Sequence, residues 1–182
     1  MKTMKKKKII FIDLPQLAHG IRFDFYEIFV NLGREFDELR IYARIPREPE
    51  AGGKDTWGLI RVAVNSGGFV TLYPSDVDGF IVEDIRKTLE RKEVGEIAIL
   101  AGDSGYYEVL RVAKRAGLKV KVILPPESNS YLLRSLADEI KTIADYAKEY
   151  APETPETKSN VYQIVARNER SETNMVMVTG GR

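Results

Sequence analysis

Short apolar runs alternate with amphipathic stretches along most of the chain. The first run, residues 9–12, ends at Asp13, as expected for a strand that is buried on both faces. The stretch that follows has apolar residues at helical spacing, with Gly33 as its predicted C-cap. The apolar face of this predicted helix consists of Ile21, Phe25, Ile28, Phe29 and Leu32.

The same alternation continues to residue 143. Further strands are predicted at 39–43, 69–73, 96–101, 119–124 and, as an edge strand, 140–143, with helices at about 57–64, 78–92, 106–116 and 130–137. Strands and helices that alternate at about 30 residues per unit predict an α/β fold, an open and mostly parallel sheet with helices on both faces. Ligand sites in such sheets lie at the carboxyl ends of the strands.

Changes in composition divide the chain into four predicted segments. These are a basic N-terminal arm (1–8), an α/β domain (9–145), a linker (146–160) and a C-terminal extension (161–182). In the extension, two apolar runs flank a charged stretch, which predicts a β-hairpin. Because a lone hairpin is only marginally stable in water, we expect it to pack on the domain or on a second copy of the chain as a homodimer.

Residue usage excludes several kinds of site. The chain has no cysteine and one histidine, His19, so disulfides, thiolate zinc sites, cysteine nucleophiles and multi-histidine metal sites are excluded. The longest uncharged run, Val62–Ser75, has 14 residues, whereas a membrane helix needs roughly 20. The apolar run after the first lysines is too short for an export segment. We therefore expect a cytoplasmic protein with no membrane partner.

Charge is unevenly distributed along the chain. The formal net charge is +1, but residues 1–8 hold five lysines and no acid, which leaves 23 basic against 27 acidic residues elsewhere. The body is therefore not a broad basic platform for nucleic acid. Electrostatic attraction to phosphate must come from the arm or from a local patch, and a small RNA substrate stays open.

Three aspartates are candidates for chemistry. Asp13 and Asp103 each follow a predicted strand, so a parallel sheet places both at one edge, and Asp84 lies in the helix before the second of these strands. Three carboxylates there would hold Mg²⁺ or Mn²⁺, which prefers oxygen ligands and activates water against a phosphodiester. Alternatively, Asp13 and Asp103 cap the helices that follow and Asp84 is solvated. Spacing alone does not decide between these interpretations.

Three segments carry a family resemblance: Phe11-Ile12-Asp13, residues 77–84 (VDGFIVED) and residues 100–107 (LAGDSGYY). In this order and spacing, over about residues 8–145, they resemble the NYN domain family, the PIN-like ribonuclease group that includes LabA-like proteins. The resemblance implies a PIN-like fold and a metal-dependent ribonuclease. Carried over by position, it makes Asp13, Asp84 and Asp103 the catalytic metal ligands, with Asp78 a helix-start residue nearby.

Two positions depart from the family pattern. The family often has Asn three residues after the first Asp, where this chain has Gln16, and the second Asp of its Gly-Asp-Ser-Asp turn is here Gly105. Loss of one acid removes negative charge that binds the metal. The alternative function is therefore a non-catalytic RNA-binding or regulatory module, and a phosphatase-type hydrolase on the same pocket is a third hypothesis.

Four residues around these acids are predicted to bind the RNA substrate: Gln16, Arg44, Ser104 and Tyr106. Arg44, at the end of the second strand, could hold a phosphate or lie in a solvated loop. Tyr106 and Tyr107 could stack on a base beside the acids, or one of these rings could be buried and the other exposed at the start of a helix. The segment 102–105 is also similar to the turn around a serine-protease nucleophile, but the single histidine and the α/β pattern argue against that chemistry.

Overall fold

A computed structural model describes residues 5–17, 23–45, 53–126 and 128–147, with only the backbone of residues 53–55. Its six strands form one sheet in the order β3-β2-β1-β4-β5-β6, and every neighbouring pair is parallel. The strands are β1 (Lys7–Asp13), β2 (Glu38–Arg44), β3 (Phe69–Tyr73), β4 (Val94–Leu100), β5 (Lys119–Leu124) and β6 (Glu139–Thr142). The predicted α/β class is confirmed.

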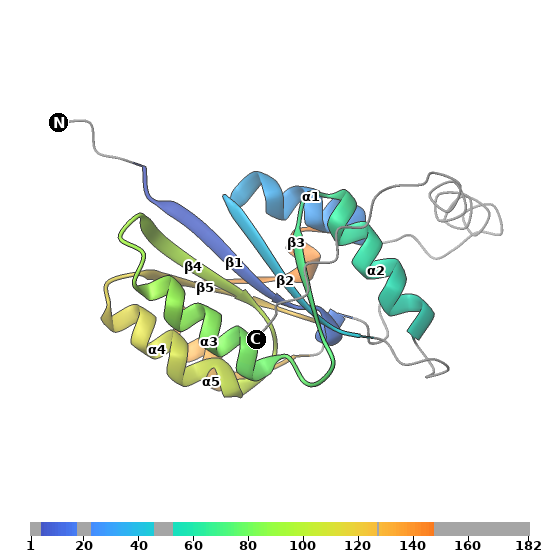
Figure 1. The fold of residues 1–182 in the computed structure, drawn as a ribbon. Helices are drawn as coiled ribbons and strands as arrows, with labels where there is room; N and C mark the ends of the chain where they lie inside the picture. Colours follow the sequence, from blue (N-terminus) through green and yellow to red (C-terminus); the bar gives the residue numbers. More distant parts are fainter. Residues whose placement is uncertain (1–4, 18–22, 46–52, 127, 148–182) are drawn as a thin grey trace.

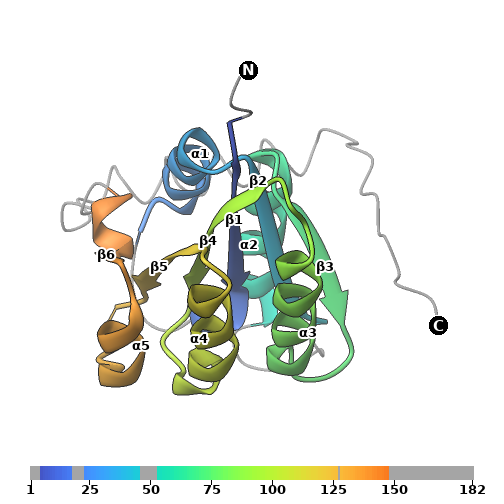
Figure 2. The same ribbon diagram turned by 90° about the vertical axis from the view of Figure 1, so that its left-hand side faces the viewer.

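Helices cover both faces of this sheet (Figures 1 and 2). The helices α1 (Phe25–Glu35) and α2 (Gly53–Asn65) pack on one face, and α3 (Asp78–Leu89), α4 (Tyr107–Arg115) and α5 (Tyr131–Leu136) pack on the other. Short 3₁₀ turns are η1 (Leu14–Leu17), η2 (Ser104–Tyr106) and η3 (Ile143–Asp145). In the part of the chain that the structure describes, no helix is long and apolar enough to span a membrane.

The central strand β1 is buried on both sides. Ile9 and Phe11 belong to the core under α3 and α4, whereas Ile10 and Ile12 belong to the core under α1 and α2. Successive side chains of a strand point to opposite faces, so Asp13 follows Phe11 toward the α3 side. The continuous apolar run therefore ends in a carboxylate that lies under the α3 layer at the carboxyl edge.

Glycines end α2 and α4, as the sequence predicts, but the glycine predicted to cap α1 does not end that helix. Gly67 and Gly117 follow α2 and α4 with φ of 83° and 84°, a region that L side chains rarely adopt. Gly33, by contrast, lies inside α1, which continues to Glu35 and has Phe36 as its C-cap. The predicted cap at Gly33 is wrong because the apolar face of α1 continues to Phe36, which is buried.

Both ends of the domain extend beyond the predicted bounds. Lys7 and Lys8 belong to β1, and their ammonium groups pair with Glu38 at 3.2 Å and with Glu96 at 3.5 Å. At the other end, Tyr146 is buried and its hydroxyl donates to Glu35 at 2.8 Å. Tyr146 is therefore part of the core, not the first linker residue. The predicted hairpin and most of the predicted linker lie outside the described residues.

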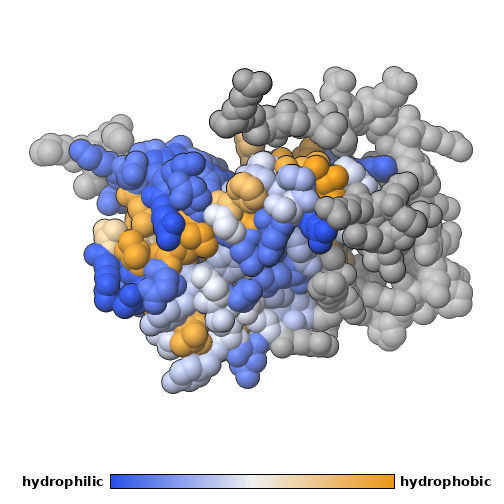
Figure 3. Space-filling model, turned by 60° about the horizontal axis from the view of Figure 1, so that its bottom comes forward, coloured by the Kyte–Doolittle hydropathy of each residue, from blue (hydrophilic) through white to orange (hydrophobic). Residues whose placement is uncertain are grey.

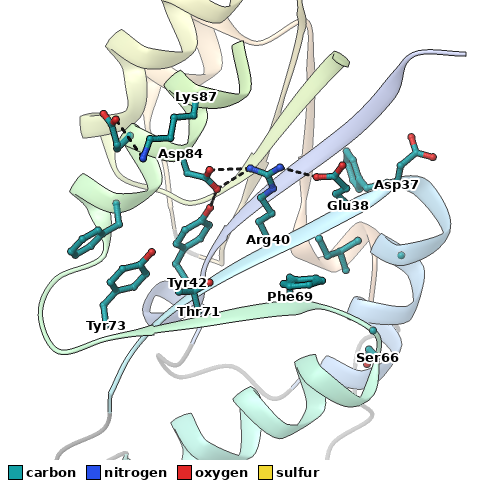
Figure 4. Close-up of a pocket in the computed structure, with 16 residues that line it drawn as sticks. Asp37, Glu38, Arg40, Tyr42, Ser66, Phe69, Thr71, Tyr73, Asp84 and Lys87 are labelled. Atoms are coloured by element: carbon teal, nitrogen blue, oxygen red, sulfur yellow. Dashed lines mark hydrogen bonds and ion pairs between the residues drawn. The ribbon is translucent and has the colours of Figure 1, made fainter. Parts of the chain in front are cut away.

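The helix α3 leads from the edge strand β3 back to the middle of the sheet. A groove of about 820 Å³ remains beside it, over β2 and β3 (Figure 4). Figure 3 shows one face of the molecule, on which hydrophobic residues form separate patches among hydrophilic ones. The groove lies on the α3 side of the sheet, with a lining that includes residues of β2, β3 and α3.

Candidate functional site

Asp13 ends β1 and is held by the segment that follows it. Its side chain is only 2% exposed, and Nε2 of Gln16 donates to its Oδ2 at 2.7 Å. The Oε1 of Gln16 accepts from the backbone N–H of Gly102 at 2.5 Å. Gln16 therefore connects the end of β1 to the loop after β4. In this structure its amide orients Asp13, and both ends of the amide are engaged with protein.

Tyr106 connects Asp13 to the start of α3. Its hydroxyl lies 2.9 Å from Oδ2 of Asp13 and 2.6 Å from Oδ1 of Asp78. The tyrosine is only 1% exposed, because η2 turns its ring into the core under α3 and α4. The prediction that Tyr106 stacks on a base is therefore wrong, and the alternative of a buried ring is correct. Tyr106 contacts the site only through its hydroxyl group, among the contacts of the described residues.

The electrostatics of this pair favour an added positive charge. Burial raises the pKa of Asp13 to about 6; the charge of Asp78 adds to the rise, and hydrogen bonds from Tyr106 and Gln16 oppose it. Burial also raises the pKa of Tyr106, so the hydroxyl keeps its single proton, which cannot be donated to two carboxylates at once. The Oδ1 of Asp13 is buried and has no hydrogen-bond partner among the described residues. A proton or a cation would complete the arrangement.

Asp103 follows β4 and is exposed to solvent. Its Oδ1 accepts from the backbone N–H of Gly105 at 2.8 Å, so it caps η2 as the alternative interpretation expected. Ser104 and Gly105 are exposed in the same turn, and Arg44 is exposed at the end of β2. These residues therefore border the carboxyl edge from neighbouring strands, on the solvent side of Asp13.

Asp84 has a different set of partners. Arg40 Nη1 lies 3.0 Å from both of its carboxylate oxygens, and the hydroxyl of Tyr42 donates to Oδ2. Among the described residues, no three His, Cys, Asp or Glu side chains lie close enough to hold a metal ion. The predicted three-carboxylate group of Asp13, Asp84 and Asp103 is therefore not assembled.

The direction of α3 explains this correction. The helix starts at the carboxyl edge and runs back along the sheet, so six residues carry the chain about 9 Å away from that edge. Asp78, the first residue of α3, stays at the edge, and Asp84 lies beside Arg40, the neighbour of Phe11 across the sheet. The sequence indicates Asp78 by its position at the start of a helix that follows a strand, whereas the family resemblance assigns the metal to Asp84.

The geometry suits a divalent cation at Asp13 and Asp78. Mg²⁺ commonly binds proteins through one or two carboxylates and keeps waters that a substrate phosphate can replace. Two observations fit such an ion: a buried oxygen of Asp13 has no partner among the described residues, and two carboxylates face a single tyrosine hydroxyl. Asp103 adds an exposed carboxylate on the loop after β4.

A six-stranded parallel sheet of this order, with helices on both faces and acids at the carboxyl ends of its central strands, is an α/β fold as found in PIN-like domains. The sequence profile of the NYN domain matches residues 7–144, and the chain belongs to this family. A crystal structure of a protein of unknown function from Vibrio parahaemolyticus is similar, with a TM-score of 0.63 and 21% identity over 81% of this chain and 99% of that chain. That likeness shows a shared fold. No curated protein matches the chain.

Proposed function

We propose that this NYN domain is a metal-dependent ribonuclease that hydrolyses RNA phosphodiester bonds at the carboxyl edge of its sheet. The observation that carries the proposal is the buried Oδ1 of Asp13, which has no partner among the described residues, beside Asp78, because a proton or a cation would complete such a carboxylate pair and a divalent cation there would bring its chemistry to the carboxyl edge. Family membership supports the same reaction class, since PIN-like domains are typically nucleases.

Each residue of the site has a distinct part in this proposal. Asp13 and Asp78 would hold Mg²⁺ or Mn²⁺, which when bound would activate water and neutralise charge on the scissile phosphate. Gln16 orients Asp13, and Tyr106 holds the two carboxylates together. Asp103, exposed on the loop after β4 at the same edge, would accept a proton from the attacking water.

The substrate-binding roles fall on exposed groups at the same edge. Arg44 would contact an RNA phosphate, and Ser104 would lie beside the substrate on the loop that carries Asp103. Asp84 would act indirectly, by fixing Arg40 and Tyr42. RNA as partner, a cytoplasmic location and a homodimer formed through the C-terminal hairpin complete the proposal.

Cleavage of a labelled single-stranded RNA by the full chain tests the proposal, with Mn²⁺, Mg²⁺ or EDTA present. We expect cleavage only with a divalent ion, and a loss of at least about 100-fold in Asp13→Asn and Asp78→Asn, in the range typical for groups that stabilise transition-state charge. Glu90→Gln, on an exposed acid at the end of α3, is the control and should cleave normally. Cleavage in EDTA, or unchanged cleavage by Asp13→Asn, would overturn the assignment.

A non-catalytic RNA-binding module is the second candidate. Gly105 in place of the family's acid favours it, as does the lack of a three-acid group in the described part of the chain. This function requires RNA binding without divalent-dependent turnover. Under it, Asp13→Asn would bind RNA as well as the parent chain or better, because the change removes a negative charge.

A further inference from the structure

The groove over β2 and β3 begins next to the proposed catalytic edge. Its floor includes Arg40 and Tyr42 from β2 and Thr71 and Tyr73 from β3, and its α3 wall begins with Phe80. Phe80 lies two residues after Asp78 on the same helix, about 3 Å further along its axis, with its side chain on a different side of the helix. Figure 4 shows Tyr42 and Tyr73 side by side at one end of the groove, with Phe69 further along β3.

Four aromatic rings form a ladder from the core to this end of the groove. Phe11 stacks on Tyr42 at 6.4 Å, Tyr42 on Tyr73 at 6.3 Å and Tyr73 on Phe80 at 3.9 Å, with interplanar angles of 19°, 12° and 18°. The ladder ends at Phe80, which is 42% exposed. Near-parallel rings that continue to the surface offer a flat aromatic platform to a further ring.

A network of charged groups fixes this ladder. The hydroxyl of Tyr42 donates to Asp84, and the guanidinium of Arg40 donates to Asp84, to Thr88 at 3.0 Å and to Glu38 at 2.8 Å. Burial and the hydrogen bond to Asp84 both raise the pKa of Tyr42, so its hydroxyl stays protonated. Tyr42, on which Tyr73 stacks, is therefore held in place before any ligand arrives, which lowers the entropy cost of stacking on the ladder.

Charge determines what kind of flat group the groove accepts. Four acidic residues line it, Asp37, Glu38, Glu83 and Asp84, against two basic ones, Arg40 and Lys87. This balance disfavours a phosphate inside the groove, whereas a nucleobase is planar and neutral. The phosphates of a bound strand would then stay at the carboxyl edge, where Arg44 is exposed.

We propose that Tyr73 and Phe80 form a stacking subsite for one unpaired nucleobase next to the cleaved phosphodiester. This inference rests on the proposed ribonuclease function and adds to it a position at which one base of the RNA is bound. Every base has an aromatic face, so the subsite selects strandedness more than sequence. A base inside a duplex is already stacked and paired, so it is not available to Phe80.

RNA binding by full-length chains tests the subsite independently of cleavage. All chains carry Asp13→Asn and are mixed, in Mn²⁺, with a fluorescein-labelled 12-nucleotide RNA whose integrity is checked on a gel. We expect Phe80→Leu to weaken binding of the single strand by about 5- to 150-fold, the range of one base stacked on an aromatic side chain, and Phe80→Tyr to retain binding. A duplex of the same sequence should bind more weakly and should not respond to Phe80→Leu.

The matched control is Phe69→Leu, at the opposite end of β3. Phe69 also lines the groove and is 74% exposed, so the same change there should leave RNA binding unaltered. A 2-aminopurine placed along the oligonucleotide should lose fluorescence on binding to the chain with Phe80 and not to Phe80→Leu. Circular dichroism melting identifies any variant that fails to fold. If Phe80→Leu does not fold, Phe80→Tyr still tests the subsite, because it keeps an aromatic ring and should retain RNA binding.

The outcomes separate this inference from the function on which it rests. Divalent-dependent cleavage by the parent chain together with unchanged RNA binding by Phe80→Leu would overturn the subsite and leave the ribonuclease assignment standing. Absence of cleavage with a loss of binding and quenching in Phe80→Leu would support the subsite and overturn the ribonuclease. Equal losses in Phe80→Leu and Phe69→Leu, or equal binding of duplex and single strand, would reject a subsite for one unpaired base at Phe80.

Discussion

Asp13 and Asp84 lie on the same side of the sheet in opposite surroundings. Asp84 receives two donors, the guanidinium of Arg40 and the hydroxyl of Tyr42, so its charge is compensated by protein. Asp13 shares the Tyr106 hydroxyl with a second carboxylate and has one oxygen without a partner among the described residues. Only Asp13 therefore has a structural reason to recruit a cation.

The raised pKa of Asp13 predicts a loss of stability as pH rises. A folded-state pKa of about 6 exceeds the unfolded value near 3.8, so folding is penalised wherever Asp13 must ionise in the folded chain. Between pH 4 and 7, the free energy of unfolding of the parent chain should fall by about 2 kcal/mol relative to Asp13→Asn. Urea titrations of both chains in EDTA at several pH values measure this difference, and parallel pH curves would contradict it. Mn²⁺ should restore stability at pH 7 to the parent chain only.

Gly105 offers a test of the departure from the family pattern. Its φ is not in the left-handed region, and a Cβ there would lie 3.4 Å from Oδ1 of Asp103, so a side chain fits without backbone strain. Gly105→Asp should tighten Mn²⁺ binding by about 1–2 kcal/mol, roughly 5- to 30-fold, through the added charge. Isothermal titration calorimetry measures the affinity, with Gly105→Ala as control. An aspartate variant no tighter than the alanine variant would show that Gly105 does not mark a missing ligand.

At the scale of elements, the turn between α2 and β3 fixes the edge strand that carries the groove. A Cβ on Gly68 would lie 2.5 Å from Cδ1 of Ile41 and 2.9 Å from the carbonyl oxygen of Ala63, closer than real contacts allow. Gly68→Ala should therefore lower the free energy of unfolding by roughly 1–3 kcal/mol. Gly33→Ala, inside α1 with open space around it, should raise it by about 0.5–1 kcal/mol. Urea denaturation compares the two, and a neutral Gly68→Ala would mean that α2 moves away from β2.

The elements themselves were predictable because burial imposes their periods. Continuous apolar runs such as residues 9–12 identified the strands, and period-3.6 faces identified the helices, since both patterns are local. The error at Gly33 arose because a glycine without positive φ is compatible with a helix interior. The order of the strands depends on which element packs beside which, so the sequence could not predict the groove over β2 and β3.

The candidate site was predictable in part for the same reason. Asp13 and Asp103 follow strands, and every parallel strand ends at the same edge, so local pattern placed them there. Asp84 was misassigned because its position depends on the direction and depth of α3 along the sheet, which only the packed structure defines. The burial of Tyr106 likewise depends on tertiary packing. The sequence has tyrosine at both 106 and 107, and it does not indicate which of the two rings enters the core.

At the scale of the whole molecule, the distribution of charge opposes the substrate that we propose. Outside residues 1–8 the chain has 23 basic and 27 acidic residues, and the proposed site itself is acidic. A polyanion therefore needs the divalent ion and the N-terminal lysines to approach. Of these N-terminal lysines, Lys7 and Lys8 are less available to RNA, because they belong to β1 and pair with Glu38 and Glu96.

Lys5 and Lys6 are exposed before β1 and remain available to RNA phosphates. Replacing both by Ser should make the salt dependence of binding to single-stranded RNA shallower, by about 1.4 in the slope of log K against log salt, since each lost phosphate contact removes about 0.7. Fluorescence anisotropy across a salt series measures the slope. The single-turnover cleavage rate at saturating RNA should not change, because β1 separates these lysines from Asp13 by about 20 Å. A large drop in that rate would place the arm at the active edge, and a lower melting temperature with an unchanged slope would give the lysines a structural role.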